Sequence, residues 1–400
     1  MKIAFLTSGG NAPCLSSSIA RLLYNYNKSG NKIEAYGYIN GFSGLLRGEK
    51  ISLPINLTDS DYENLYKMGG SLIGNSRIKL TNKQDCIDKK LINKDQDPLK
   101  VASEQLIKDK IDILHPIGGD DTNSTARDLA NYIKSKGIDI TLVGIPKTID
   151  NDIYPVKQSL GASSAAESGA MFFNNIVNEN NMSPRQLIVH EVMGRNSGWL
   201  TAYTAKIYND ILDRKKNSLE NLNLKPIHSL DRFKIHALYV PEESYNFTIE
   251  LDRLEKVMDN IGCLNIFISE GAFLKEISNE MESKGNKINK DAFGHIQLDS
   301  IDTGKWISKR ISDKINIQRV LIQKSGYFAR SSAPNSEDLE YIFKICDFAF
   351  KQALDGNSGV AGVDERSDQL SCIDFNLIKG DKGLDIDSKW YLNMIKEIKA

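Results

Sequence analysis

The sequence predicts an α/β fold made of two doubly wound halves, each with a mainly parallel central sheet. Segments typical of strands and of helices alternate along the chain, and the predicted strands are largely apolar runs, as in residues 111–117 and 263–268. Such runs are typical of parallel sheets that helices cover on both faces. In addition, glycine-containing turns directly follow several strands, at the sheet edge where open α/β folds bind ligands.

The first half is expected over residues 1–160. Its predicted strands cover residues 2–6, 33–38, 111–117 and 138–145. Its predicted helices cover residues 16–26, 102–110 and 124–136. Because strand and helix alternate in this order, the half is expected to be Rossmann-like.

The second half is expected over residues 161–336. Its predicted strands cover residues 186–192, 235–240 and 263–268. Its predicted helices cover residues 162–178, a stretch starting at 198, and 251–260. Residues 337–400 are expected to pack back partly onto the first half, through helices over 337–353 and 387–399.

Composition narrows the function classes. The 400 residues contain 51 Lys and Arg against 52 Asp and Glu, a formal net charge of −1. The protein therefore lacks the bulk cationic surface that nucleic acids require, and it must hold any anionic substrate with local groups of Lys and Arg. The five cysteines form no CxxC pair, which fits reduced thiols. With no apolar run long enough to span a membrane, the sequence predicts a cytoplasmic protein without membrane partners.

The most informative turn is the GGDDTN segment at residues 118–123, directly after a predicted strand. A strand-to-helix turn of this kind attracts anions through its backbone N–H groups and the positive end of the helix. The adjacent carboxylates of Asp120 and Asp121 therefore make electrostatic sense with a cation present. The simplest such cation is Mg²⁺ that carries a phosphate.

A second acidic turn, KTIDND at residues 147–152, follows the next predicted strand. If the turn is extended, the side chains of Asp150 and Asp152 share one face. A carboxylate there can accept the proton of a sugar hydroxyl, while metal ligation and an Asx turn at the strand end are the alternative roles. Because Lys147 stands beside these acids, the turn favours phosphate handling, and the two turns together predict phosphoryl transfer.

Two further turns of the first half offer groups for a phosphate. Residues 7–13 contain Gly9 and Gly10, and residues 69–77 end in Arg77. Backbone amides and a guanidinium can hold a phosphate, although a structural turn and a solvated surface cation are the plain alternatives. Neither a GxxxxGK[ST] P-loop nor a GxGxxG dinucleotide motif occurs in the chain.

The second half carries candidates at its own strand ends. Arg195 suits an anionic partner and Glu270 suits sugar hydroxyls, each just beyond a predicted strand. Tyr327 and Arg330 add a phenol and a planar guanidinium three residues apart, the latter suited to a phosphate monoester. Taken alone, each of these side chains could be a solvated surface group.

The order and spacing of these motifs resemble the phosphofructokinase family, and specifically its pyrophosphate-dependent branch. The resemblance covers most of residues 1–365, in segments 7–13, 41–45, 69–77, 118–123, 146–152, 193–195, 268–271, 327–330 and 356–363. ATP-using members have glycine at the positions of Asp121 and Lys147, whereas pyrophosphate-dependent members have Asp and Lys. The resemblance implies a phosphofructokinase-like fold, diphosphate and fructose 6-phosphate as substrates, and a homodimer or homotetramer.

The resemblance also implies roles for individual residues. Asp150 would take the proton of the C1 hydroxyl of fructose 6-phosphate, with Thr148 and Asp152 orienting the acceptor. Lys147 would neutralise charge on the transferring phosphoryl group, Asp121 would occupy the place of the α-phosphate of ATP, and Asp120 would hold Mg²⁺. The residues implied for binding diphosphate are Gly10, Arg77, Gly119 and Lys147. The residues implied for binding the sugar phosphate are Thr148, Ile149, Asp150, Met193, Gly194, Arg195, Glu270, Tyr327 and Arg330.

Two alternatives accompany this reading. An ATP-dependent phosphofructokinase is disfavoured by Asp121 and Lys147, and a catalytically silent homologue that binds sugar phosphates is disfavoured by the intact acidic residues. One departure concerns the family arginine that reaches into a neighbouring subunit's site. Its position is Gln186 here, and Arg185 lies one residue away.

Overall fold

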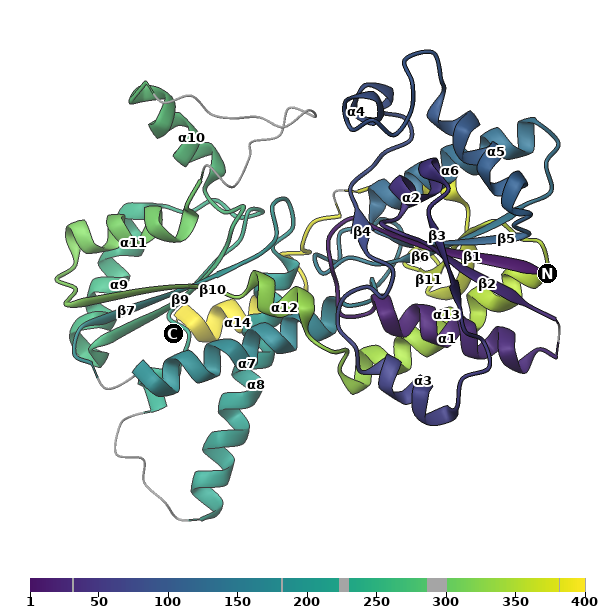
Figure 1. The fold of residues 1–400 in the computed structure, drawn as a ribbon. Coiled ribbons are helices and arrows are strands. Elements are labelled where there is room, and N and C mark those ends of the chain that lie inside the picture. Colours follow the sequence, from purple (N-terminus) through teal and green to yellow (C-terminus); the bar gives the residue numbers. More distant parts are fainter. Residues whose placement is uncertain (31, 181–182, 223–229, 286–300, 381, 400) are drawn as a thin grey trace. The chain divides into compact units, whose positions relative to one another are not determined.

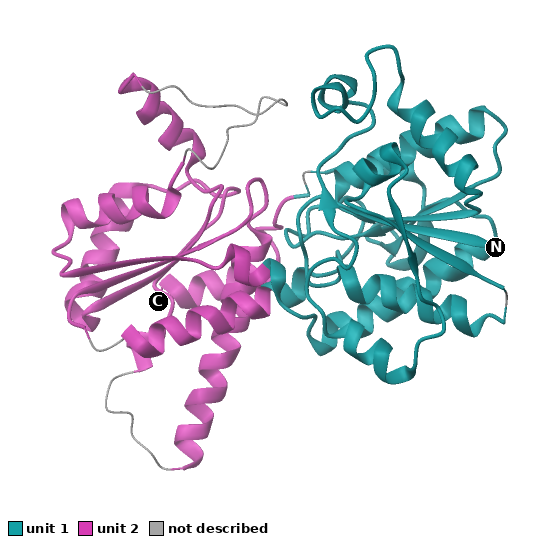
Figure 2. Ribbon diagram, viewed as in Figure 1, with its two compact units in different colours: residues 1–165, 330–382 teal, residues 166–329, 383–400 magenta. Residues whose placement is uncertain are grey.

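The computed structural model describes residues 1–400 except 31, 181–182, 223–229, 286–300, 381 and 400 (Figure 1). The chain forms two compact units (Figure 2). Unit 1 contains residues 1–165 and 330–382, and unit 2 contains residues 166–329 and 383–400. The polypeptide therefore passes from one unit to the other three times, after residues 165, 329 and 382.

Unit 1 is built on one mixed sheet with the strand order β12-β11-β6-β5-β1-β2-β3, in which β4 pairs beside β1. Its strands are β1 (Lys2–Ser8), β2 (Glu34–Tyr38), β3 (Lys50–Leu53), β4 (Asn75–Ser76), β5 (Ile113–Gly118), β6 (Thr141–Pro146), β11 (Gly359–Asp364) and β12 (Gln369–Ile373). All its pairings are parallel except those of β3 and β12, which lie antiparallel at the two edges. The carboxyl ends of β1, β5 and β6 thus meet at one edge of the sheet.

Helices cover both faces of the unit 1 sheet (Figure 1). They are α1 (Leu15–Lys28), α2 (Phe42–Arg47), α3 (Asp59–Tyr66), α4 (Lys83–Asp88), α5 (Pro98–Asp109), α6 (Asp120–Ser135), α13 (Ser336–Leu354) and the short η3 (Phe375–Leu377). Strand β1 shows why residues 3–6 are all apolar. Ala4 and Leu6 pack in the core shared with α2, α5 and α6, while Phe5 stacks on His115, which bonds Tyr26 of α1 on the other face.

Unit 2 contains a four-stranded parallel sheet in the order β10-β7-β9-β8. Its strands are β7 (Gln186–Val192), β8 (Ala237–Tyr239), β9 (Cys263–Ser269) and β10 (Arg319–Lys324). Its helices are α8 (Trp199–Asn221), η1 (Leu230–Phe233), α9 (Phe247–Ile261), α10 (Leu274–Ser283), α11 (Thr303–Lys314) and α14 (Lys389–Lys399). It also contains most of α7 (Ala162–Asn180), which begins in unit 1, and of α12 (Gly326–Ser331), which ends there. The predicted α/β class with mainly parallel sheets is confirmed.

The expected place of the final helix is wrong. Tyr391 and Met394 of α14 pack in the core of unit 2 with Phe173 and Tyr208, and the Tyr391 hydroxyl donates to Glu243 at 2.9 Å. Periodicity shows which face of a helix is apolar but not which surface that face covers. Residues 383–400 therefore belong to unit 2, and not to the first half.

Several strands were not predicted, namely β3, β4, β10, β11 and β12. In β10, Arg319 and Val320 are exposed, so this strand lacks the apolar run that marked the buried strands of both units. No helix in the described part of the chain is both long enough and apolar enough to span a membrane.

Candidate active site

The turn between β5 and α6 holds its two carboxylates in different environments. Asp120 is half-buried, and its pKa is raised to about 6 by burial and then by the charges of Asp121 and Asp152. Asp121 is exposed, with 60% of its side chain accessible, and its Oδ1 lies 2.6 Å from Nζ of Lys79. Neighbouring like charges are stabilised by a cation, and Lys79 supplies one to Asp121.

The carboxylates at this turn fit a Mg²⁺ ion bound partly by the protein and partly by water and substrate. Among the described residues, no group of three or more His, Cys, Asp or Glu side chains is arranged to hold a metal ion. Mg²⁺ is commonly bound by one or two carboxylates, with water and substrate phosphate oxygens completing its shell. Asp120 can supply such a carboxylate, whereas a site made of protein ligands alone is not present in the described residues.

The backbone of Gly380 packs directly on the carboxylate of Asp120. A Cβ added to Gly380 would collide with Oδ2 of Asp120. Gly380 therefore lies against the predicted cation site, and a larger residue there would require the Asp120 side chain to move. No local sequence pattern predicts this contact, because Gly380 lies far along the chain from Asp120.

Lys147 joins two of the predicted turns. It follows β6 and is only 3% exposed, and its Nζ donates to the carbonyl oxygen of Gly10 at 2.6 Å. Burial, with a smaller contribution from the charge of Arg77, lowers the pKa of Lys147 to about 8, while Cys14, Asp150 and Asp152 oppose the shift. The ammonium group is therefore fixed beside the glycine turn after β1, among charges of both signs.

Two guanidinium groups lie beside the same glycine. A methyl group built on Gly10 would be 3.8 Å from Nη2 of Arg77 and 3.9 Å from Nη1 of Arg330. The structure thus brings Gly10, Arg77, Lys147 and Arg330 together in unit 1. Arg330 was expected to contact the sugar 6-phosphate, and its position here makes it a neighbour of the diphosphate-binding candidates as well.

The loop after Lys147 is not a regular extended strand. Asn151 has φ of 51°, and its Oδ1 accepts the N–H of Ser159 at 2.8 Å. The condition under which Asp150 and Asp152 share one face is therefore not met, because a left-handed residue between them turns the chain. The Thr148 hydroxyl oxygen accepts the N–H of Asp150 at 3.2 Å, which fixes this loop locally.

In unit 2, the loops after β7 and β9 are joined to each other. The N–H of Gly194 donates to Oε1 of Glu270 at 3.2 Å, and the N–H of Gly271 donates to the carbonyl of Gly194 at 3.1 Å. A Cβ on Gly271 would collide with the carbonyl oxygen of Arg195. These contacts bring Gly194, Arg195 and Glu270 together at the carboxyl end of the sheet.

Helix α12 carries the candidate Tyr327 and contacts the candidate Met193. The sulfur of Met193 would lie 2.7 Å from a Cβ on Gly326, so Met193 packs on the residue that precedes Tyr327. The Tyr327 side chain is 83% exposed. The structure therefore groups all the sugar-binding candidates of unit 2 around the ends of β7, β9 and β10.

Neither residue near the position of the family's interface arginine joins this group. Gln186 is buried at the start of β7. Arg185 has φ of 45° and donates to the carbonyl of Asn316 at 2.6 Å and to Asp259 at 2.9 Å. Both residues lie at the amino end of β7, whereas Met193 and Gly194 follow its carboxyl end.

Two lysines that contact the candidate site had not been predicted. Lys79 pairs with Asp121, and Lys382 bonds the loop that carries Asp150 and Asp152. Lys79 lies two residues after Arg77, so the density of basic residues there was an available signal. Lys382 had no such signal, because its partners are distant in sequence.

Comparisons with known proteins identify relatives of this chain. A family model described as Phosphofructokinase matches residues 2–210. The pyrophosphate–fructose 6-phosphate 1-phosphotransferase of Methylotuvimicrobium alcaliphilum is 48% identical over 400 residues, covering 99% of this chain and 96% of that protein. The protein of the same name from Mastigamoeba balamuthi is 45% identical over 397 residues, covering 99% and 95%.

A solved structure shows the same fold. The pyrophosphate-dependent phosphofructokinase from Marinobacter aquaeolei matches with a TM-score of 0.71, covering 100% of this chain and 91% of that one. Its sequence is 18% identical, so this likeness concerns the fold alone.

Proposed function

This chain belongs to the phosphofructokinase family, and from that premise we propose that it is a diphosphate-dependent 6-phosphofructokinase. It transfers a phosphoryl group reversibly between diphosphate and the C1 hydroxyl of fructose 6-phosphate, giving fructose 1,6-bisphosphate and phosphate. The observation that carries this proposal is the buried Lys147, whose ammonium group is fixed on Gly10 in the turn after β1. A lysine at this position, together with Asp121, marks the diphosphate-using branch in the sequence.

In the proposed reaction, one group of residues moves a proton and another neutralises the charge of diphosphate. The Asp150 carboxylate takes the proton of the C1 hydroxyl, the C1 oxygen bonds to the terminal phosphorus, and the bridging P–O bond of diphosphate breaks to release phosphate. Lys147 and Arg77 neutralise negative charge on the diphosphate, the main route by which enzymes catalyse phosphoryl transfer. Asp120 would hold Mg²⁺, which when bound neutralises diphosphate oxygens.

Two sets of residues are assigned to the sugar phosphate. Gly194, Arg195 and Glu270 form a polar group at the carboxyl end of the unit 2 sheet, suited to hydroxyls and a phosphate. Thr148, Ile149 and the Asp150 loop would orient the reacting end. We further propose a cytoplasmic homodimer or homotetramer, and the five free cysteines support the reducing compartment.

Initial rates with each donor test this function. With fructose 6-phosphate and Mg²⁺, diphosphate should give fructose 1,6-bisphosphate and ATP should give little, and EDTA should abolish the rate until Mg²⁺ is restored. Equal or faster turnover with ATP would favour the ATP-dependent alternative. Binding of fructose 6-phosphate with no turnover of either donor would favour a silent homologue. Sedimentation of the same preparation gives the oligomeric state.

Asp121→Gly should relax the choice of donor. Two like charges about 4 Å apart repel by about 4 kcal/mol at an effective dielectric near 20, but Asp121 is exposed and paired with Lys79, which weakens its repulsion of an ATP phosphate. We therefore expect the preference for diphosphate over ATP to fall roughly tenfold, equivalent to about 1.4 kcal/mol. Ratios of kcat/KM for the two donors measure this, and an unchanged ratio would contradict the role of Asp121.

The loss of charge on Lys147 at alkaline pH should lower the activity with diphosphate. Its ammonium group is protonated below its pKa of about 8 and neutral above it, so kcat/KM for diphosphate should fall as pH rises through about 8. Bound diphosphate favours the charged form and should hold kcat constant to higher pH, since kcat reports the complex and kcat/KM the free enzyme. Profiles of both parameters check this. A Lys147→Met variant that keeps the same alkaline fall would assign it to another group.

A further inference from the structure

The loop that carries Asp150 and Asp152 is hydrogen-bonded to residues that follow η3. Tyr154 and Lys379 pair through two backbone hydrogen bonds of 2.8 and 2.9 Å. The N–H of Lys382 donates to the carbonyl of Asp152 at 3.1 Å. We call Lys379, Gly380 and Lys382 the strap, since together they contact the loop and the carboxylate of Asp120.

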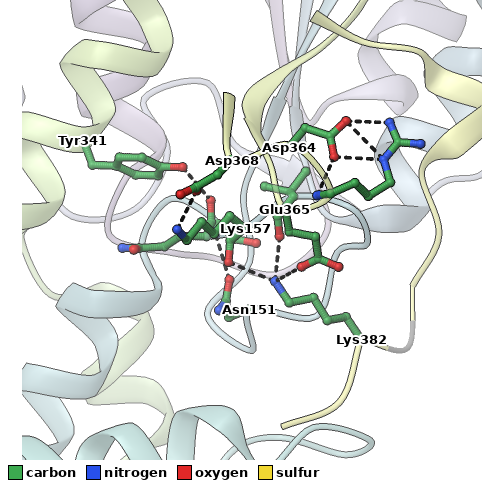
Figure 3. A network of polar contacts seen from close by, with 11 residues as sticks. Asn151, Lys157, Tyr341, Asp364, Glu365, Asp368 and Lys382 are labelled. Atoms are coloured by element: carbon green, nitrogen blue, oxygen red, sulfur yellow. Dashed lines mark hydrogen bonds and ion pairs between the residues drawn. The ribbon is translucent and has the colours of Figure 1, made fainter. Parts of the chain in front are cut away.

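The side chain of Lys382 makes three polar contacts. Its Nζ donates to the carbonyl of Val156 at 2.7 Å and to that of Lys157 at 2.9 Å, and it lies 3.1 Å from Oε2 of Glu365 (Figure 3). With 19% of its side chain exposed, the ammonium group is largely withdrawn from water. One lysine therefore bonds three carbonyls of the loop, one through its backbone and two through its side chain.

The β11–β12 turn completes this support. The N–H of Glu365 donates to the carbonyl of Pro155 at 2.8 Å, and the N–H of Lys157 donates to the carbonyl of Val363 at 2.8 Å. The loop is thus packed between the strap and the β11–β12 turn, and Lys382 contacts the loop and the turn together (Figure 3). Removing its Nζ would leave two carbonyls and the carboxylate of Glu365 without their shared cation, which is unfavourable in a largely buried place.

We propose that Lys382 is a positioning residue for phosphoryl transfer, one that aligns Asp150 and Asp152 by fixing the backbone of their loop. The inference rests on the proposed function, because it takes Asp150 as the base. Misplacing a reacting group by about 1 Å can lower the rate by about 10²-fold. Lys382 contacts no residue assigned to hold diphosphate, so kcat should depend on it more than KM.

The test compares two lysines of the same network. Lys382→Met keeps an unbranched side chain, one atom shorter, but removes the charge and donors, and kcat should fall about 10- to 100-fold with little change in either KM. Lys382→Arg should recover part of this loss. Lys157→Met is the matched control: its ion pair with Asp368 is exposed on both sides, 57% and 68%, and such pairs contribute about 0–1 kcal/mol, so its kcat should stay near the wild-type value.

A double-mutant cycle separates positioning from general destabilisation. In an Asp150→Asn background Lys382→Met should lower kcat little further, because the base it aligns is already gone. A loss of kcat equal in both backgrounds would overturn the proposal. So would recovery of kcat in Lys382→Met with Glu365→Gln, since Lys382 would then only neutralise Glu365.

Two further outcomes are distinguishable. If Lys382→Met does not fold, Lys382→Gln, which keeps an N–H donor on a shorter arm, takes its place in the cycle. A wild-type enzyme without diphosphate-dependent turnover would refute the proposed function. A wild-type enzyme with full turnover beside a fully active Lys382→Met would refute this inference alone.

Discussion

Asp150→Asn is expected to lower kcat by about 10²–10⁴-fold, the usual contribution of a general base. The amide has nearly the shape of the carboxylate but cannot take the proton of the C1 hydroxyl. The N–H of Asp150 bonds the Thr148 hydroxyl, a contact of the backbone that the substitution leaves in place. KM values for both substrates should therefore change little, and calorimetry should still detect their binding.

Asp139→Asn provides the control for this result. Asp139 is exposed just before β6, at the opposite end of that strand from Lys147 and Asp150, so its loss should leave kcat unchanged. A rate of Asp150→Asn within about tenfold of wild type would show that another group takes the proton.

Lys147→Met should be the second most damaging change, with kcat lower by about 10²–10³-fold, as for removal of one preorganised charge at a developing transition state. The buried site accepts the unbranched side chain of Met, so folding should survive. The Gly10 carbonyl loses its donor at 2.6 Å, and the diphosphate loses a cation, so KM for diphosphate should rise while KM for fructose 6-phosphate should not.

Steady-state kinetics with each substrate varied in turn measure this split. Lys134→Met, at the exposed end of α6, removes a lysine of the same unit away from the sheet edge and should have no effect. If Lys147→Met keeps wild-type kcat with diphosphate, Lys147 does not act on the transferring group.

Those elements of the fold could be predicted whose secondary structure is determined by the local sequence. Strands such as β1 and β7 are buried on both faces, and each therefore contains a run of consecutive apolar residues, 3–6 in β1 and 187–189 in β7. Glycine turns mark the ends of β1 and β5. The edge strand β10 was missed because several of its side chains meet water. Helix α14 was assigned to the wrong unit, because its apolar stripe fits any complementary surface.

The candidate site shows the same limit. Asp120 and Asp121 follow β5 and Lys147 follows β6, two parallel neighbours in one sheet, so topology alone brings their turns to one edge. The turn of the chain at Asn151 and the bonds of Lys382 arise from contacts between distant segments. No local sequence pattern predicts them, because a lysine anywhere in the chain can donate to a backbone carbonyl once the fold brings the two together.

The place of β11 beside β6 affects how the protein is made. While the chain is being synthesised, β6 exposes an unpaired edge until residues 359–364 leave the ribosome, by which time every described strand of unit 2 has already been translated. Open sheet edges recruit other strands and promote aggregation. A nascent chain stalled before residue 359 would therefore be a substrate for chaperones, because β11, which covers this edge of β6, is translated only after the described strands of unit 2.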